Sequence, residues 1–339
     1  MTAAVLYAPH DLRIEQRPVP SPSQGEVLVR ILSVGVCGSD VHYYEHGRIG
    51  DFVVRSPLVL GHESSGQIVE VGEGVSRSRV GDRVAIEPGG ACGRCDQCRA
   101  GRYNLCPYMR FHGTPPVDGT LSEFVTVKSD LAYKVPDEIS DNAAALLEPL
   151  SVGIWANEKA WTQMGTSLLI AGAGPVGLVT TKVAHAAGAT RIVVTDVNRH
   201  RLEAARTSGA TEIALAGAEA IDGDFDAFID CSGSPSAIAA GARSVRAAGR
   251  IVLVGMGADE LTLPLAVIQR RELVITGTFR YANTWPTAIA LVASGRVGLD
   301  DLVTGEFGLA ATEQALNAGR DPHSVKAVVR PGHTERQAL

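Results

Sequence analysis

The stretch "SLLIAGAGPVGLVTTKVAHAAGA", residues 167–189, decides the fold of this 339-residue chain. It reads as a short apolar strand, a glycine-rich turn and an alanine-rich helix. Gly172, Gly174 and Gly177 fall at the turn, where glycines permit a tight bend, close approach of the backbone to a pyrophosphate and close packing of the helix. The pattern predicts the first strand, turn and helix of a dinucleotide-binding parallel sheet.

Asp196 lies near the end of the next apolar run, "RIVVTDV", at about the distance from the glycines where dinucleotide-binding proteins carry an acidic residue. A carboxylate there accepts hydrogen bonds from the ribose hydroxyls of NAD and repels the 2′-phosphate of NADP. Arg201 qualifies this prediction, because a cation there could stack on adenine or bind a phosphate. We expect NAD as the cofactor.

The pattern of apolar runs and turns changes along the chain and predicts two domains, which agrees with its length. Within residues 151–280, "DAFIDCSG", "GRIVLVGMG" and "ELVITGTFR" supply further strands among helical stretches, which predicts a doubly wound parallel sheet, the Rossmann arrangement. Residues 1–150 instead carry short alternating runs such as "EVLVRILSVGV" and "SSGQIVEVG" between glycine-containing turns, which predicts a β-rich domain. In residues 281–339, "LVTGEFGL" and "KAVVRP" are expected to be strands that return to this first domain.

Composition excludes several classes of function. The chain is 45% hydrophobic and 20% charged, as is usual for a globular protein, and its net charge of -6 offers no basic surface for nucleic acid. Its first residues do not have the pattern of a signal peptide, and no stretch is apolar for long enough to span a membrane. We expect a cytoplasmic protein.

A second stretch, "GACGRCDQCRAGRYNLC" at residues 90–106, holds four of the six cysteines. Cytosolic thiols stay reduced, so such a pattern favours metal binding over disulfides or unrelated thiols. The spacing lets a tight loop direct four thiolates to one centre, which is the closed tetrahedral site of a structural zinc. The predicted ligands of this zinc are Cys92, Cys95, Cys98 and Cys106.

Further polar residues point to a second metal: Cys37, His62, Glu63 and Glu148. Thiolate, imidazole and carboxylate are all zinc ligands, and three protein ligands with one exchangeable position are typical of a catalytic zinc. Taken alone, each has an ordinary explanation as a core thiol, a buried histidine or a surface acid. Their spacing does not prove that they meet.

The sequences of these segments resemble those of the zinc-containing medium-chain alcohol dehydrogenases. Within that family they resemble the sorbitol (L-iditol, xylitol) branch of polyol dehydrogenases. The resemblance covers nearly the whole chain, through "GVCGSDVHYYEHGRIGDFVV", "PLVLGHESSG", "LLEPLSVG", "GAGPVG" and "GTFRYANTWP". It implies a GroES-like catalytic domain at residues 1–150, completed by residues 281–339, and a Rossmann NAD-binding domain at residues 151–280. It also implies that Cys37, His62 and Glu63 hold a catalytic zinc, with Glu148 bound to the metal directly or through a water. Which carboxylate is bound at rest stays open.

The same resemblance implies oxidation of a secondary hydroxyl of a linear polyol to a ketose, with hydride transfer to NAD. Ser39 and His42 resemble the family's proton relay; alternatively, Ser39 only caps a helix that begins near Asp40 and His42 is a surface histidine. The resemblance assigns substrate contacts to Tyr43, Phe111, Glu148, Arg280 and Tyr281, for which the alternative is packing between domains. Besides the three glycines, Asp196 and Arg201, it assigns cofactor contacts to Val176, Val254, Gly255, Met256, Thr278, Phe279 and Arg280.

Two alternatives from other classes remain. A zinc dehydrogenase of threonine, butanediol or another small alcohol would keep the metal without the "FRYANTWP" and "HGRIGDF" segments. A non-catalytic nicotinamide-binding protein would be free to lose the zinc ligands and Ser39. The physiological polyol is left open, and a homotetramer is expected from the family alone.

Overall fold

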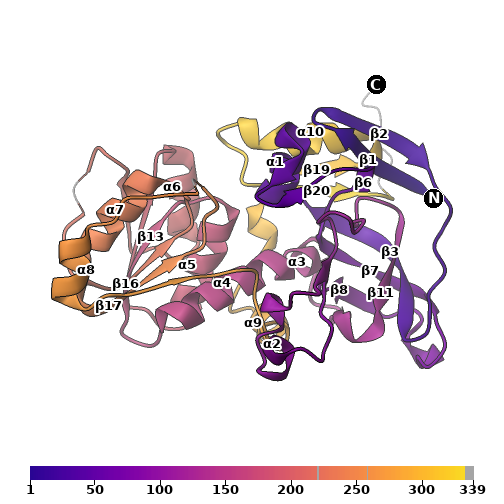
Figure 1. The fold of residues 1–339 in the computed structure, drawn as a ribbon, viewed down its shortest axis with the longest axis horizontal. Coiled ribbons are helices and arrows are strands. Elements are labelled where there is room, and N and C mark those ends of the chain that lie inside the picture. Colours follow the sequence, from indigo (N-terminus) through magenta and orange to yellow (C-terminus); the bar gives the residue numbers. More distant parts are fainter. Residues whose placement is uncertain (220, 258, 333–339) are drawn as a thin grey trace. The chain divides into compact units, whose positions relative to one another are not determined.

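The computed structural model describes residues 1–219, 221–257 and 259–332, and the chain divides into two compact units (Figure 1). Unit 1 comprises Met1–Glu148 and Trp285–Leu339, and unit 2 comprises Pro149–Thr284. Residues 333–339, which the sequence assigns to the catalytic domain, lie outside the described residues.

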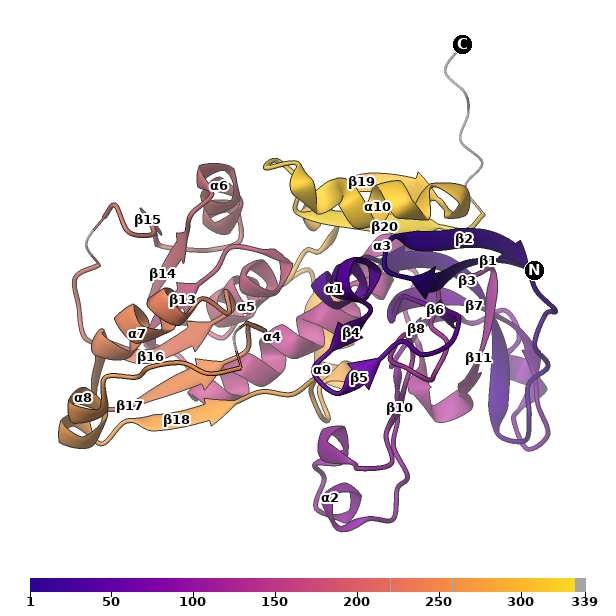
Figure 2. The same ribbon diagram turned by 45° about the horizontal axis from the view of Figure 1, so that its top comes forward.

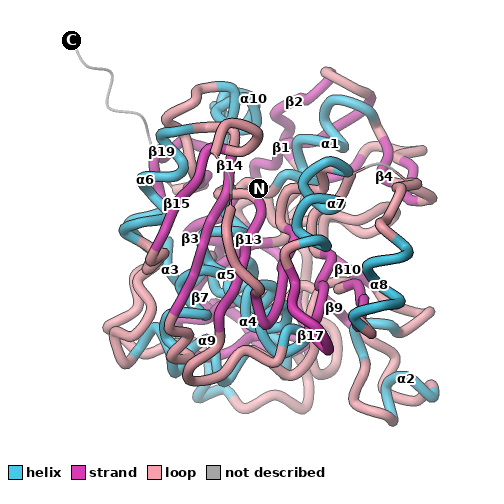
Figure 3. The backbone as a smooth tube through the Cα atoms, turned by 90° about the vertical axis from the view of Figure 1, so that its left-hand side faces the viewer, coloured by secondary structure: helices cyan, strands magenta, loops and turns pink. Residues whose placement is uncertain are grey.

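Unit 2 is built on a six-stranded sheet with the spatial order β15-β14-β13-β16-β17-β18 and parallel pairing throughout. Figure 3 shows β13, β14 and β15 side by side. Renumbered along the chain, this is the order 3-2-1-4-5-6 of a doubly wound dinucleotide-binding sheet. The strands are β13 (Ser167–Ala171), β14 (Arg191–Asp196), β15 (Glu212–Leu215), β16 (Phe225–Asp230), β17 (Val245–Leu253) and β18 (Val274–Gly277).

Helices connect these strands, as parallel pairing requires. They are α5 (Pro175–Ala186), α6 (Arg199–Thr207), α7 (Pro235–Arg243) and α8 (Leu265–Arg271). The central strands are nearly continuously buried, because a parallel sheet is covered on both faces. Leu169, Val193, Phe225, Phe228 and Ile251 belong to the resulting core. The predicted doubly wound sheet is confirmed.

Unit 1 is β-rich, and its main sheet joins both ends of the chain. The strand order is β12-β8-β7-β3-β20-β19, with β11 also pairing with β3. Figure 2 shows the late strands β19 and β20 beside the first strands of the chain. The members are β3 (Glu26–Gly35), β7 (Glu63–Val71), β8 (Arg83–Ile86), β11 (Phe124–Lys128), β12 (Ala132–Lys134), β19 (Val303–Gly308) and β20 (Lys326–Arg330). Strand β20, the "KAVVRP" segment, therefore joins the main sheet of unit 1.

Smaller elements complete unit 1. The short strands are β1 (Thr2–Ala8), β2 (Asp11–Gln16), β4 (Arg48–Ile49), β5 (Phe52–Val53), β6 (Leu58–Val59), β9 (Gly89–Gly90) and β10 (Arg110–Phe111). The helices are α1 (Gly38–His46), α2 (Asp96–Arg99), α3 (Asp141–Ala145), α9 (Trp285–Ala293) and α10 (Thr312–Asn317), while α4 (Leu147–Ala160) runs across the boundary between the units. The 3-10 turns are η1 (Arg77–Arg79), η2 (Tyr103–Leu105), η3 (Ser129–Leu131), η4 (Asp300–Leu302), η5 (Leu309–Ala311) and η6 (Ala318–Arg320). Among the described residues, no helix is both long and apolar enough to cross a membrane.

Candidate metal and cofactor sites

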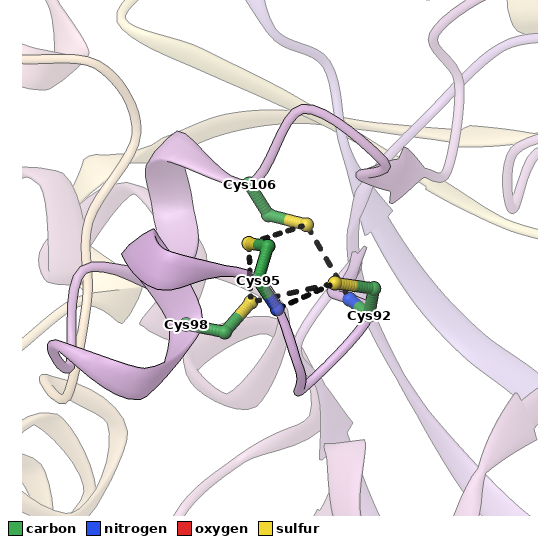
Figure 4. Close-up of side chains that lie close together, drawn as sticks. All are labelled: Cys92, Cys95, Cys98 and Cys106. Carbon is green, nitrogen blue, oxygen red and sulfur yellow. Dashed lines mark hydrogen bonds between the residues drawn. The ribbon is translucent and has the colours of Figure 1, made fainter.

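The segment from β9 to β10, residues 89–111, forms a small lobe of unit 1. Its four cysteines converge on one point (Figure 4). Their sulfur atoms lie 3.5 Å apart for Cys95 and Cys98, and 3.9 Å apart for Cys92 and Cys98 and for Cys95 and Cys106. A tetrahedral zinc with sulfur bonds of 2.3 Å separates its ligands by about 3.8 Å. The described cysteines are all free thiols, so the donor set fits a closed tetrahedral zinc.

Backbone N–H groups of the lobe favour the thiolate form of Cys92, whereas burial and the neighbouring sulfurs raise the pKa of Cys98 to about 12. The backbone N–H groups of Arg94 and Cys95 lower the pKa of Cys92 to about 6. The backbone N–H of Cys92 in turn donates to the sulfur of Cys106 at 3.4 Å. Such N–H···S bonds orient metal ligands and stabilise their charged form.

A buried carboxylate at the base of the lobe joins it to the rest of unit 1. Glu87 is only 2% exposed and accepts hydrogen bonds from the hydroxyls of Tyr103, inside the lobe, at 2.8 Å and of Tyr133, on β12, at 3.1 Å. Tyr133 stacks on Trp285 with ring centroids 5.3 Å apart. Burial raises the pKa of Glu87 to about 7, although both hydroxyls lower it.

A second cluster contains Cys37, His62 and Glu63, whose donor atoms all lie within 4.8 Å of one another. Cys37 is the N-cap of α1, so its sulfur lies at the start of that helix. His62 and Glu63 are 7% and 1% exposed and stand at the start of β7. Thiolate, imidazole and carboxylate in this proximity are a donor set that fits zinc.

The buried carboxylate of Asp40 contacts two residues of this cluster, Cys37 and His62. One of its oxygens accepts from the backbone N–H of Cys37 at 3.0 Å, and the other accepts from that of Gly61 at 2.9 Å and lies 3.6 Å from Nδ1 of His62. Burial opposes a charge on His62, but Asp40 and Cys37 raise its pKa well above the usual value. A carboxylate on Nδ1 leaves Nε2 to face a metal, the usual arrangement of a zinc-bound histidine.

A buried lysine supplies the positive charge beside the cluster. Nζ of Lys326 lies 2.7 Å and 2.5 Å from the two carboxylate oxygens of Glu63 and donates to the carbonyl of Val36 at 2.8 Å. Burial lowers the pKa of Lys326, but Glu63 and Cys37 outweigh this and raise it. The ammonium therefore stays charged against the anionic ligands.

The register of the sheet explains how this ion pair forms. Strand β3 lies between β7 and β20, and Gly35 at its end pairs with both Glu63 and Val328. A Cβ at Gly35 would lie 2.1 Å from Oε2 of Glu63 and 3.1 Å from Cε of Lys326. Only glycine leaves room for the two side chains to meet across the strand.

The remaining residues predicted for this site in unit 1 are placed as follows. Glu148 is 5% exposed and its charge raises the pKa of Lys326, but it is not among the three residues whose donor atoms lie within 4.8 Å. Phe111, 7% exposed, packs its ring 5.6 Å from that of His62. Tyr43 is 3% exposed on α1.

Ser39 and His42 lie on α1, directly beyond Cys37. The N-cap of this helix is Cys37, and the side chain of Asp40 completes its capping box, so Ser39 is not the cap. The alternative explanation of Ser39 as a helix cap is therefore wrong. Ser39 is half-buried and His42 is exposed, and their spacing places them on one face of the helix.

The glycine-rich turn of unit 2 opens onto a pocket of 1020 Å³. Gly172 has a φ of +97°, and a Cβ on Gly177 would lie 1.8 Å from the carbonyl oxygen of Gly172, so the bend requires both glycines. Gly174, the N-cap of α5, instead faces open space. A glycine that packing does not require leaves room for a phosphate at the helix N-terminus.

Asp196 and Arg201 line the same pocket together with Gly172 and Gly174. Oδ2 of Asp196 accepts from the backbone N–H of Ala173 at 2.7 Å, so the carboxylate is fixed against the glycine turn. Nε of Arg201 is buried and has no hydrogen-bond partner among the described residues. The Nε of Arg201 is thus a donor left for a ligand, and the pocket fits the adenosine half of a dinucleotide.

The other predicted cofactor and substrate residues of unit 2 do not line this pocket. Val176 lies in the first turn of α5. Val254, Gly255 and Met256 follow β17, and Thr278, Phe279 and Arg280 follow β18, which places them at the carboxyl edge of the sheet where α/β proteins bind ligands. Arg280 lies over the ring of Phe279 at 4.7 Å, and Tyr281 is 3% exposed.

A doubly wound dinucleotide-type unit and a β-rich unit with a cluster of a cysteine, a histidine and a carboxylate define a metal-dependent oxidoreductase class. Residues 23–137 match the Alcohol dehydrogenase GroES-like domain, and residues 175–294 match the Zinc-binding dehydrogenase family. The chain therefore belongs to the zinc-containing medium-chain alcohol dehydrogenases.

Particular relatives refine this comparison. The chain is 44% identical over 326 residues to the sorbitol dehydrogenase of Bacillus subtilis, covering 93% of this chain and 92% of that protein. A short chain alcohol dehydrogenase of Escherichia coli, solved with the cofactor NADH, superposes with a TM-score of 0.91 at 30% identity, covering 97% and 99% of the two chains. The 2R,3R-butanediol dehydrogenase of Bacillus subtilis superposes with a TM-score of 0.89 at 31% identity, covering 97% and 99%.

Three residues that contact these sites, Asp40, Lys326 and Glu87, have no role predicted from the sequence. Asp40 was considered only as the start of a helix, although a buried acid three residues after a ligand cysteine is a signal for a supporting contact. Lys326 directly precedes the apolar run of β20 and Glu87 directly follows that of β8, so each is a charge at a position expected to be buried.

Proposed function

We propose that this protein is an NAD-dependent zinc polyol dehydrogenase of the L-iditol 2-dehydrogenase type, which oxidises a secondary hydroxyl of a linear polyol to a ketose. The observation that carries the proposal is the cluster of Cys37 with the buried His62 and Glu63, found in a chain that is 44% identical to a sorbitol dehydrogenase. The class of reaction follows from the family, and the substrate class from this relative.

Two zinc ions per chain are part of the proposal. Cys37, His62, Glu63 and Glu148 would hold or approach the catalytic ion, and Cys92, Cys95, Cys98 and Cys106 the structural one. The catalytic zinc supplies a Lewis acid that favours ionisation of a hydroxyl near neutral pH, and NAD accepts the hydride. Lys326 offsets the negative charge that three anionic side chains bring to the site.

Ser39 and His42 would carry the proton that the substrate loses. Ser39 stands two residues beyond a proposed metal ligand, and His42 follows one helical turn later, on the exposed side of α1. A hydroxyl can accept and donate a proton at once, and an imidazole exchanges protons with water near neutral pH. This order of groups fits a route from a buried site to solvent.

Recognition of several hydroxyls would depend on Tyr43, Glu148, Arg280 and Tyr281, with Phe111 as an apolar wall beside His62. The cofactor would bind along the carboxyl edge of the sheet in unit 2. Its proposed contacts are Gly172, Gly174, Val176, Gly177, Asp196, Arg201, Val254, Gly255, Met256, Thr278, Phe279 and Arg280.

We propose residues 1–150 and 281–339 as the catalytic domain, residues 151–280 as the NAD-binding domain, and a homotetramer in the cytoplasm. The tetramer is supported by family resemblance alone, and light scattering of the purified protein tests it.

A butanediol dehydrogenase is the second candidate, because such an enzyme is 31% identical with nearly complete coverage. The higher identity to a sorbitol dehydrogenase and the "FRYANTWP" and "HGRIGDF" segments favour the polyol. A non-catalytic protein would have no reason to keep the three clustered donors.

The deciding experiment follows NADH absorbance after mixing the protein with NAD and a panel of sorbitol, xylitol, L-iditol, ribitol, galactitol, threonine and 2,3-butanediol. The proposal requires turnover of at least one polyol above threonine and butanediol, loss of turnover on zinc chelation and recovery with added zinc. Preference for butanediol would favour the second candidate, and no turnover of any substrate by zinc-loaded protein would contradict both.

A further inference from the structure

Two histidines, His42 and His46, lie on the exposed face of α1. The proposed reaction gives a role to His42 and none to His46. His42 and His46 are four residues apart, both are exposed, and their ring centroids lie 4.6 Å apart at an interplanar angle of 71°. Residues at this spacing share one face of a helix. The rings are therefore neighbours in a region open to solvent.

We propose that His42 and His46 form an additional binding site for zinc, occupied when the ion is in excess, and that an ion bound there slows the reaction. The second half of this inference rests on the proposed function, because it uses His42 as the outer group of the proton relay. The first half depends only on the two side chains.

The geometry suits chelation by two imidazoles. Zinc–nitrogen bonds of 2.0–2.1 Å at a near-tetrahedral angle place the two nitrogens about 3.3 Å apart. Five-membered rings with centroids 4.6 Å apart can bring one nitrogen each to that separation by side-chain rotation alone. Paired histidines at i and i+4 of a helix are a known zinc-binding pattern.

The helix that carries the pair is well fixed. Its N-terminus is closed by the capping box of Cys37 and Asp40, and at its C-terminus the backbone N–H of Gly47 donates to the carbonyl of Tyr43. Tyr43 and Tyr44 bury the opposite face. A rigid scaffold lowers the entropic cost of bringing two ligands to one ion.

An ion on this pair would act on the relay directly. Metal-bound imidazole nitrogen is deprotonated and cannot accept a proton from the direction of Ser39. Ser39, His42 and His46 follow each other along one helix face, so the ion would sit at the outer end of that line. Two protein ligands leave the remaining positions to water, so the ion should exchange readily.

Equilibrium dialysis of the zinc-loaded protein against excess Zn²⁺ tests the site, with His46→Gln and His46→Ala beside the wild type. We expect the wild type to take up one more zinc per chain than either variant. The matched control His323→Gln, which changes another exposed histidine, should bind as the wild type does. Equal uptake by the wild type and both His46 variants would overturn the site, whatever substrate the enzyme uses.

Initial rates in the same zinc series test the effect on catalysis. The zinc concentration for half-inhibition should rise by at least about tenfold in the His46 variants, because one of two ligands is lost, while Mg²⁺, which prefers oxygen ligands, should not inhibit any of them. Extra zinc that binds to the wild type without slowing it would overturn the link to the relay. Inhibition of equal strength in wild type and variants would do the same.

Discussion

Lys326 and Glu63, 263 positions apart in the sequence, form a buried ion pair with 2.5 Å between Nζ and the nearer carboxylate oxygen. They are 3% and 1% exposed, and they meet across Gly35 from the two neighbours of strand β3. Glu63 therefore faces a fixed positive charge as well as Cys37 and His62.

Removing the lysine should destabilise the protein strongly. Lys326→Met leaves a carboxylate buried without its counter-charge, which costs about 3 kcal/mol or more of unfolding free energy. Urea unfolding of the metal-free protein measures this loss. The double variant Glu63→Gln/Lys326→Met should recover part of it, because neither charge is then buried alone. A Lys326→Met protein as stable as the wild type would show that the pair contributes nothing.

The structural zinc should be separable from the catalytic one. Cys95→Ser should release one ion per chain and lower stability by roughly 1–3 kcal/mol, because a closed thiolate site contributes to folding. Serine remains a good N-cap for α2, so the loss comes from the missing thiolate. Metal analysis and thermal unfolding check this, with Tyr108→Ser on the exposed surface of the lobe as the control. One zinc ion per chain in the wild type would contradict the prediction, as would a Cys95→Ser protein that keeps as much zinc as the wild type.

Glu87 should make stability depend on pH. Its pKa is raised by burial to about 7 in the folded chain, above that of an unfolded glutamate. The folded state therefore favours the protonated form, and the associated stability is complete below about pH 4.5 and is lost as pH rises through about 7, by about 3 kcal/mol at most. Glu87→Gln should lack this loss, so its stability relative to the wild type should increase between pH 5 and pH 8.

Denaturant unfolding at several pH values measures the effect of Glu87. The exposed Glu138→Gln serves as the control and should keep the wild-type dependence. Parallel pH curves for the wild type and Glu87→Gln would mean that Glu87 stays ionised in the folded chain.

Asp196 should make the enzyme prefer NAD. Its carboxylate lines the pocket, and it would repel a 2′-phosphate, which should favour NAD by about 100-fold in kcat/KM, or roughly 2.7 kcal/mol. Asp196→Asn removes the charge and keeps one oxygen acceptor, which can serve the N–H of Ala173 or that of Asn198 but not both, and it should reduce the preference for NAD over NADP. Equal efficiencies in the wild type would show that Arg201 outweighs Asp196.

The parts of the sites that could be predicted from the sequence are those whose residues lie close together along the chain. Gly172 follows one strand and Asp196 ends the next, and the four cysteines lie close together in the sequence, so spacing indicates the kind of site that each set forms. The ion pair of Lys326 with Glu63 depends instead on which strands neighbour β3, and that register is a property of the folded sheet. The contact of Asp40 with His62 and that of Glu87 with Tyr103 likewise depend on segments that meet only in the folded chain.

The proposed choice of substrate rests on polar groups that simple alcohols cannot satisfy. A buried polar group left without a partner costs about 1–3 kcal/mol, so 2-propanol should lose the contribution of several groups that a polyol satisfies. Arg280→Ala should lower polyol turnover far more than the residual activity on 2-propanol, whereas a residue that only packs or binds cofactor would lower both in proportion.

The decisive measurement is kcat/KM for sorbitol, xylitol and 2-propanol in the wild type and in Arg280→Ala, with NAD saturating. We expect the better polyol to exceed 2-propanol by about 100-fold or more in the wild type, and the ratio to fall sharply in the variant. A wild type that oxidises 2-propanol as efficiently as either polyol would contradict the assignment of this protein as a polyol dehydrogenase.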